Sequence, residues 1–305
     1  MSARLVIAMT VLLLRGGAED SPAQTAGIRG TRIDGDVYGN LYVLDAEKNT
    51  LRLYDRDGVL RREIGGTGWA NDQFDRPSGI WARNGIDVFV ADFGNHRIQR
   101  FDRSLTYVST FSTRDHANPD ERFGYPSDVT LSRLGELFIC DTENSRVIKV
   151  DAQSRVERSF GGFGGGQGRL SAPVRLGAGP RDGIYVIDGN RVAVFDAFGN
   201  FVHDLLPGII RHPNALYAYP DGVLVADSGT LYLFDGEERP TGAVPLATLL
   251  RDPGRDPGRD PGPESGSDSG PGAGPILGLV LQQGTLRILT GEGLRTVLDF
   301  NAKTH

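Results

Sequence analysis

Residues 76–111 read RPSGIWARNGIDVFVADFGNHRIQRFDRSLTYVSTF, and this stretch decides the fold class. Four short runs rich in β-branched and aromatic residues follow one another, each bounded by Gly, Asn or Asp. Such composition is typical of strands joined by tight turns. The stretch therefore predicts four strands, at 78–82, 87–91, 97–101 and 106–111. One small sheet of this kind cannot bury its apolar faces alone, so we expect it to pack against copies of itself.

The same pattern recurs along the chain. An aspartate ends the second strand of five copies, at Asp45, Asp92, Asp141, Asp188 and Asp227. Another aspartate ends the third strand of the same copies, at Asp55, Asp102, Asp151, Asp196 and Asp235. A leading proline stands 15 residues before the first aspartate at Pro77, Pro126 and Pro173, and 14 residues before it at Pro213. Pro275 stands 15 residues before Thr290 and marks a degenerate sixth copy.

Six copies of this kind predict an all-β fold, a six-bladed β-propeller of four-stranded antiparallel blades with a degenerate last blade. The propeller is expected to occupy residues 30–300. Gly and Pro interrupt the chain too often for a helical solenoid. Residues 251–274, RDPGRDPGRDPGPESGSDSGPGAG, contain almost no apolar side chains, so they are expected to be a disordered insertion before the last blade.

The first residues, MSARLVIAMTVLLL, combine one arginine with a short apolar run. This pattern is typical of a secretory signal peptide, here within residues 1–23, and predicts export to the periplasm or the extracellular space. The run is too short to span a bilayer as a helix. A second interpretation remains open, in which this segment is the strand that completes the sixth blade and closes the ring.

The overall charge argues against nucleic acid as a partner. The formal net charge is −6 and the pI is about 5.4, whereas phosphate binding needs a basic surface. The single cysteine, Cys140, lies within a predicted buried strand, which indicates a core residue rather than a reactive thiol. We expect a monomer without a membrane span.

The turn DFGNHRIQRF resembles the NHL-repeat family, whose hallmark is an Asp-x-Gly-Asn-His-Arg-Ile/Val run preceded by Pro-x-Gly-Ile and a Gly-rich loop. The second copy matches this run in full, at Asp92, Gly94, Asn95, His96, Arg97 and Ile98. The third copy matches in part, at Asp141, Asn144, Arg146 and Val147, and the fourth keeps Asp188, Asn190 and Arg191. The resemblance implies a propeller, whose relatives bind proteins, RNA or small ligands or act as enzymes.

We interpret the repeated motif residues as structural, because a site is usually unique whereas this motif recurs. The aspartate can accept backbone N–H groups of the following turn, and the arginine can donate to a neighbouring blade. The two asparagines are expected in left-handed turn positions. The structural set is Asp92, Asn95, Arg97, Asp141, Asn144, Arg146, Asp188 and Arg191.

The resemblance also raises the possibility of a propeller enzyme, and such enzymes hold a metal at the channel mouth. Around the ring, the residues that follow the leading prolines contain one carboxylate, Asp128, which is expected to face Arg175 of the next copy. A hard cation prefers several oxygen ligands, so we predict no cofactor and no catalytic residue. If a divalent metal such as calcium or zinc binds, its ligands are Asp128 and Asn214. Only His96 and His212 are expected on the loop face, three blades apart, which is too few for zinc.

The loops between blades are expected to share one face with the turns that carry the motif. Aromatic and arginine side chains on such a face are typical of protein-binding anchors. The alternative is that Trp69 and Phe163 pack between blades. The sequence thus predicts a non-catalytic scaffold that binds a protein, peptide or cell-envelope ligand, with a lactonase-like metal-dependent hydrolase or lyase as the alternative. The candidate binding residues are Trp69, His96, Arg122, Tyr125, Arg175, Arg211 and His212.

Overall fold

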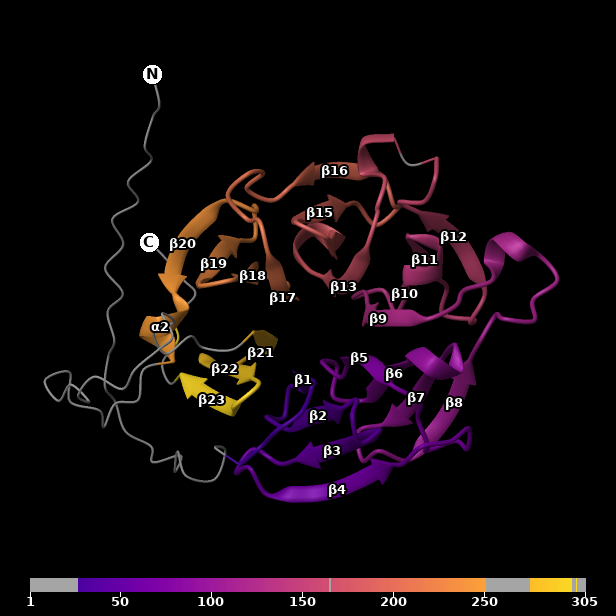
Figure 1. Cartoon of the computed structure of the whole chain (residues 1–305), viewed down its shortest axis with the longest axis horizontal. Helices are drawn as coiled ribbons and strands as arrows, with labels where there is room; N and C mark the ends of the chain where they lie inside the picture. The colour runs from indigo at the N-terminus through magenta and orange to yellow at the C-terminus, as the bar shows by residue number, and fades with distance from the viewer. Residues whose placement is uncertain (1–26, 165, 251–274, 298–299, 301–305) are drawn as a thin grey trace, which may run out of the picture.

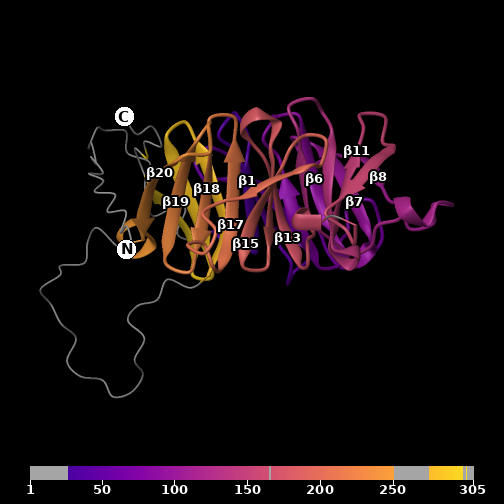
Figure 2. The same cartoon turned by 90° about the horizontal axis from the view of Figure 1, so that it is seen from above.

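Six antiparallel sheets stand side by side in a ring in the computed structural model, which describes residues 27–164, 166–250, 275–297 and 300. The view down the axis shows one strand of each sheet next to the centre and the others following outward (Figure 1). Seen from the side, the strands run along the axis and the loops gather at two ends (Figure 2). The predicted six-bladed propeller is confirmed, with five four-stranded blades and a three-stranded sixth.

In blades 1 to 3, consecutive strands pair from the axis outward. Blade 1 contains β1 (Arg32–Gly35), β2 (Leu41–Asp45), β3 (Thr50–Tyr54) and β4 (Leu60–Gly65). Blade 2 contains β5 (Pro77–Trp81), β6 (Asp87–Asp92), β7 (Arg97–Asp102) and β8 (Tyr107–Phe111). Blade 3 contains β9 (Pro126–Leu131), β10 (Leu137–Asp141), β11 (Arg146–Val150) and β12 (Val156–Phe160).

Blades 4 to 6 continue the same order. Blade 4 contains β13 (Pro173–Ala178), β14 (Ile184–Asp188), β15 (Arg191–Phe195) and β16 (Phe201–Asp204). Blade 5 contains β17 (Pro213–Tyr219), β18 (Gly222–Asp227), β19 (Thr230–Asp235) and β20 (Pro240–Pro245). The short helix α2 (Leu246–Leu249) follows blade 5, and blade 6 contains β21 (Ile276–Gln282), β22 (Thr285–Thr290) and β23 (Gly293–Val297).

The strands predicted from residues 76–111 lie within one residue of those observed. The last of them starts at Tyr107 rather than at residue 106, because Thr106 still belongs to the turn before the strand. The Asp102 carboxylate accepts the backbone N–H groups of Ser104 and Thr106, both at 2.8 Å. The helix α2 was not predicted.

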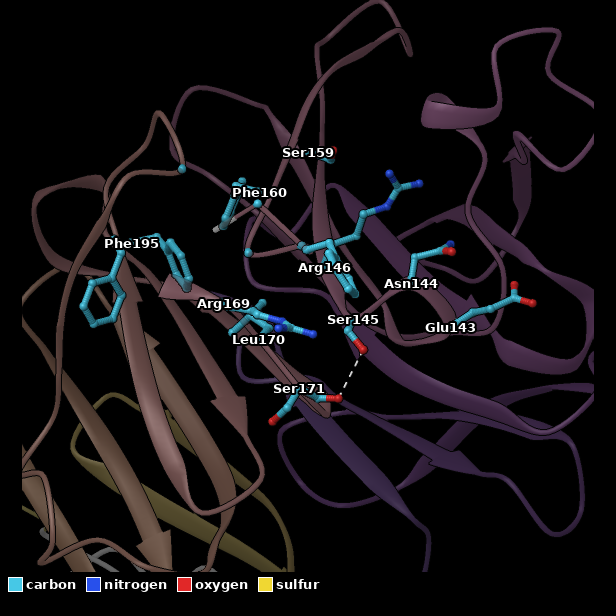
Figure 3. Close-up of a pocket in the computed structure, with 16 residues that line it drawn as sticks. Glu143, Asn144, Ser145, Arg146, Ser159, Phe160, Arg169, Leu170, Ser171 and Phe195 are labelled. Atoms are coloured by element: carbon cyan, nitrogen blue, oxygen red, sulfur yellow. Dashed lines mark hydrogen bonds between the residues drawn. The ribbon is translucent and has the colours of Figure 1, made fainter. Parts of the chain in front are cut away.

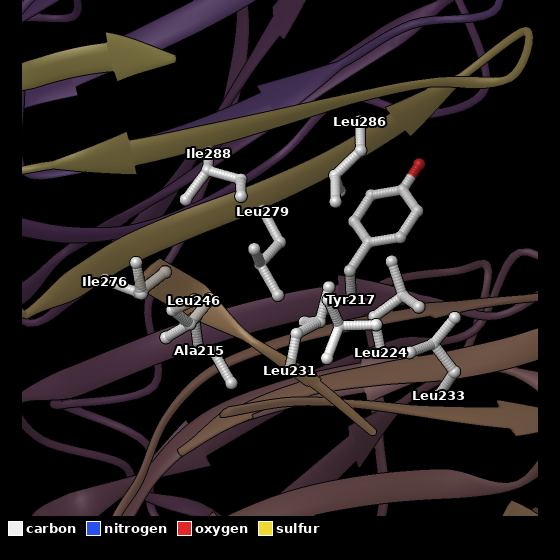
Figure 4. Packing of buried hydrophobic residues seen from close by; sticks show 12 residues of the cluster. Ala215, Tyr217, Leu224, Leu231, Leu233, Leu246, Ile276, Leu279, Leu286 and Ile288 are labelled. Atoms are coloured by element: carbon white, nitrogen blue, oxygen red, sulfur yellow. The ribbon is translucent and has the colours of Figure 1, made fainter. Parts of the chain in front are cut away.

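The core lies between blades rather than within any one of them. The second strand of a blade is buried on both faces, as in β2, β10 and β14, whereas the outer strand β4 is largely exposed. Figure 4 shows the packing at one such junction, where blade 5 meets blade 6. There Leu224 and Leu231 pack with Leu279, Leu286 and Ile288. Strands buried on both faces explain the continuous apolar runs that end at each aspartate.

Blades 6 and 1 meet through side chains and a few hydrogen bonds. The Gln282 amide donates to the carbonyl oxygens of Asp36 at 2.6 Å and Asn40 at 3.2 Å. The Leu294 N–H donates to the Ile28 carbonyl oxygen at 3.0 Å. Within the described residues, β23 has no outer neighbour. The predicted signal peptide or closing strand at 1–23 and the predicted insertion at 251–274 lie outside the described residues.

The part of the chain that the structure describes contains no helix long and apolar enough to span a bilayer.

Candidate functional site: the loop face and the channel

Two sets of connections meet at one end of the ring, because strands alternate in direction. These are the turns between the second and third strands of each blade and the loops that lead into the next blade. We call this end the loop face and the other end the opposite face. The turns include two short 3-10 segments, η1 (Phe93–Asn95) and η3 (Thr142–Asn144).

The motif of blade 2 joins its turn to the loop from blade 1. Asp92 is fully buried, and its Oδ2 accepts from Arg97 Nε at 2.7 Å and from Asn95 Nδ2 at 2.9 Å. Its Oδ1 accepts the Asp75 N–H at 2.8 Å. The remaining Arg97 nitrogens donate to loop carbonyls at 2.9 to 3.0 Å, those of Trp69, Ala70 and Gln73.

Blades 3 and 4 repeat these contacts with fewer partners. Arg146 Nε donates to Asp141 at 2.8 Å, as does Asn144 Nδ2. Arg191 holds Asp188 through Nε at 3.1 Å and NH2 at 2.9 Å. Each arginine also donates to a carbonyl of the loop entering its blade, that of Arg122 or Arg169, both at 2.6 Å. The motif residues therefore connect each turn to that loop.

The prediction of left-handed asparagines was wrong by one position. The left-handed residues are His96, with φ 50°, and Ser145, with φ 49°. Asn95 and Asn144 instead end the 3-10 turns and use their amides to bind the motif aspartates. Each asparagine side-chain amide donates to a motif aspartate, which fixes the position of the asparagine in the turn. The left-handed backbone conformation is therefore adopted by the next residue, His96 or Ser145.

Three aromatic side chains on the loop face are exposed to solvent, and we call them the aromatic arc: Trp69, Tyr125 and Phe163. Their exposed fractions are 64%, 36% and 91%. Trp69 and Phe163 do not pack between blades, which was the alternative considered for them. Arginine guanidiniums lie over two of the rings, Arg97 at 5.9 Å from Trp69 and Arg169 at 4.4 Å from Phe163.

Within the aromatic arc, Tyr125 packs against His96. Their rings lie 4.2 Å apart, and His96 Nδ1 accepts the Tyr125 N–H at 3.1 Å. Burial, and then the nearby Arg114, lower the pKa of His96. A neutral imidazole that accepts at Nδ1 agrees with that direction. Tyr125 also packs against Phe93 at 5.1 Å.

An open cleft of about 900 Å³ separates the rims of blades 3 and 4, and we call it the 3–4 cleft. Figure 3 shows the side chains around it, with the hydrogen bond from Ser145 Oγ to the Ser171 carbonyl oxygen at 3.1 Å crossing from one blade to the other. Phe160 and Phe163 supply apolar surface, and Glu143 and Arg169 supply opposite charges. Within the described residues, neither Glu143 nor Arg169 is in an ion pair.

The other predicted binding residues lie apart from this group. Arg122 is exposed, and its Nε donates to the His116 carbonyl oxygen at 2.6 Å. Arg211 and His212 lead into blade 5, three blades from His96, and their N–H groups donate to Asp227 at 2.9 Å. Arg175 lies in the central channel. The structure thus groups His96 with Tyr125 and separates the rest.

Of the six residues that stand two places after the leading position of each blade, five line a small cavity in the channel: Arg32, Asp128, Arg175, Ala215 and Leu277. Asp128 accepts the N–H groups of Val129 and Leu176, both at 2.9 Å, and the second of these comes from blade 4. Burial raises the pKa of Asp128 to about 7. Arg32 was not predicted, because blade 1 has Gly30 in place of the proline; the same spacing counted from Gly30 leads to Arg32.

The residues around Asp128 do not fit a divalent metal. Arg32, Arg83 and Arg175 line the same cavity as Asp128, so three guanidiniums share the cavity with its carboxyl group. Asn214, the other candidate ligand, does not line this cavity, and its buried Oδ1 has no hydrogen-bond partner among the described residues. Among the residues that the structure describes, no three His, Cys, Asp or Glu side chains form a group that could hold a metal ion.

A model of the NHL repeat matches residues 123–149, which run from the loop before β9 through η3 into β11. The chain is an NHL-repeat β-propeller. The match falls on blade 3, where the motif is Asp141, Asn144 and Arg146.

Two curated proteins are similar to this NHL-repeat propeller over part of their own length. Protein brain tumor of Drosophila melanogaster is 28% identical over 149 residues, which are 48% of this chain and 14% of that protein. A probable peptidyl-alpha-hydroxyglycine alpha-amidating lyase of Caenorhabditis elegans is 31% identical over 87 residues, which are 27% of this chain and 25% of that protein. The chain therefore matches at most about a quarter of either relative.

Among solved structures, virginiamycin B lyase from Staphylococcus aureus is similar, with a TM-score of 0.56 and 10% identity. The superposition covers 88% of this NHL-repeat propeller and 83% of the lyase. At that identity the similarity shows the fold alone.

Proposed function

We propose that this NHL-repeat propeller is a non-catalytic binding module, and that it holds a protein partner through an extended peptide segment in the 3–4 cleft. The observation that carries the proposal is the cleft of about 900 Å³ with Phe163 at its rim, 91% exposed. An exposed large aromatic beside a cleft is typical of a binding anchor, because covering it removes apolar surface from water.

The charges of the cleft indicate which side chains the bound peptide carries. Arg169 favours an acidic side chain, and Glu143 favours a basic one, since neither has an ion-pair partner among the described residues. Phe163 favours an apolar or aromatic side chain of the partner. Trp69 and Tyr125 extend the contact around the loop face toward blades 1 and 2. The expected segment therefore carries one apolar anchor and charges of both signs.

The catalytic alternative, a metal-dependent hydrolase or lyase, would use Asp128 and Asn214 in the channel. Both oxygens of Asp128 already accept backbone N–H groups, and the surrounding guanidiniums oppose a cation. The names of two similar proteins contain lyase, but the similarity to the solved one extends only to the fold. These contacts favour the binding proposal.

The test is selection of peptides from a random displayed library on the intact protein, followed by titration of individual peptides. We expect selected peptides to bind Phe163→Ser and Arg169→Gln at least about tenfold more weakly than the wild type, a loss of about 1.4 kcal/mol. The matched control is Leu134→Ser, since Leu134 is 69% exposed on the opposite face of blade 3. Peptides that bind Phe163→Ser as tightly as the wild type would contradict the proposal.

A further inference from the structure

A small cavity of about 40 Å³ lies in the channel and is lined from the inner strands of all six blades. Two guanidiniums line it without an ionic partner within 4 Å among the described residues, those of Arg32 in β1 and Arg175 in β13. The nitrogen Nε of each is buried and has no hydrogen-bond partner in the part of the chain that the structure describes. Their other nitrogens reach only neighbouring carbonyls, Arg32 to Thr31 and Arg175 to Val174.

The other charged groups of the cavity are already engaged. Arg83 Nε lies 3.2 Å from Asp34 Oδ1, and the Arg83 guanidinium lies 4.0 Å from the centre of the Tyr217 ring. Asp34 also accepts the Ala82 N–H at 3.0 Å. Asp128 is held by its two backbone N–H groups. The remaining lining residues, from β1, β5, β13, β17 and β21, are apolar or glycine.

Three guanidiniums face two carboxyl groups, so the cavity carries at least one positive charge. Buried guanidinium nitrogens without acceptors are costly, and an anion that reaches them would remove this cost. The planar fork of a guanidinium matches the two oxygens of a carboxylate. A water needs about 10 to 15 Å³ measured in this way, so the cavity has room for about three waters and excludes large ligands.

We propose that the channel binds a small carboxylate between Arg32 and Arg175. The site is separate from the 3–4 cleft, so it does not depend on the function proposed above. Arg175 is partly exposed, which gives the ligand a route from solvent. The negative charge of Asp128 opposes the anion. Because burial raises the pKa of Asp128 to about 7, binding is expected to tighten as the pH falls through 7.

Acetate is the probe, and its affinity is measured on the full chain by the rise in melting temperature with concentration and by acetate NMR line broadening. Sodium chloride at equal ionic strength and acetamide are the reference solutes. We expect acetate alone to stabilise the wild type, and Arg32→Gln and Arg175→Gln to bind it at least about tenfold more weakly. Arg56→Gln is the control, since Arg56 is exposed in the outer turn between β3 and β4.

Loss of binding in the arginine variants could also come from misfolding, so a variant that increases the affinity for acetate is needed. Asp128→Asn is that variant. We expect acetate to bind this variant at least about threefold more tightly at pH 8, since one opposing charge is removed. The proposal is wrong if chloride stabilises the wild type as well as acetate does. It is also wrong if Arg175→Gln keeps the acetate effect, or if Asp128→Asn binds no more tightly.

Discussion

Among single residues, the pair Asp92–Arg97 is the strongest test of what the motif does. Its side chains are 0% and 8% exposed, and Arg97 holds the buried carboxylate and three loop carbonyls. Arg97→Ala leaves a buried charge and unpaired carbonyls, so we expect a loss of about 3 to 5 kcal/mol in the free energy of unfolding. Urea denaturation measures it.

Arg100 is the matched control for this substitution. It lies on the same strand and pairs with Asp87 at 2.8 Å, but its side chain is 43% exposed. We expect Arg100→Ala to cost about 0 to 1 kcal/mol, because exposed ion pairs contribute little. Equal losses for the two variants would show that the motif arginine does not join the loop to the turn.

At the level of elements, the approach of the inner strands β5 and β9 depends on a glycine. A Cβ added at Gly79 would lie 2.4 Å from Asp128 Oδ1 and 2.6 Å from Asp128 Cα. Gly79→Ala must therefore push β5 and β9 apart or displace the Asp128 carboxyl group. We expect a loss of about 1 to 3 kcal/mol, the usual cost of overpacking, seen as a lower melting temperature.

Gly229→Ala is the comparison for this change. A Cβ at Gly229, in the turn between β18 and β19, meets nothing within 4 Å. We expect its melting temperature to stay close to that of the wild type. A Gly79→Ala variant as stable as Gly229→Ala would mean that the inner strands tolerate a wider spacing than the structure shows.

For the whole molecule, stability is expected to depend on pH through the channel. Asp128 shares its cavity with Arg32, Arg83, Arg175 and Asp34, and burial raises its pKa from 3.8 to about 7. Between these values the folded chain keeps a proton that the unfolded chain releases. The contribution of the Asp128 carboxyl group to the free energy of unfolding is therefore fully present below about pH 4. It is lost as the pH rises to about 7, by at most about 1.4 kcal/mol per pH unit.

Carbon NMR of the aspartate carboxyl groups measures the titration, and Asp128→Asn assigns the signal. We expect a midpoint near pH 7, and we expect the stability difference between wild type and Asp128→Asn to change between pH 4 and 7 and to level off above. A midpoint near 4 would show that the arginines and the two N–H groups outweigh burial.

Much of the fold could be predicted because its signals are local. Leading prolines, strand-ending aspartates and continuous apolar runs depend on the backbone and on nearby residues, and each repeats at nearly constant spacing. The candidate site was predicted less well. Tyr125 and His96 were placed on the loop face, packing between blades was left open for both Trp69 and Phe163, and Glu143, Arg169 and Arg32 were not considered.

The sequence by itself determined the number of blades, the position of most strands and the face that carries the motif turns, since turn chemistry and strand pattern act within a few residues. Only the tertiary structure decided that Trp69 and Phe163 are exposed. It also brought Arg32 and Arg175, 143 residues apart in sequence, to the same cavity. The reason is physical: contacts across the channel depend on how the ring closes, and closure depends on the packing of every blade against the next.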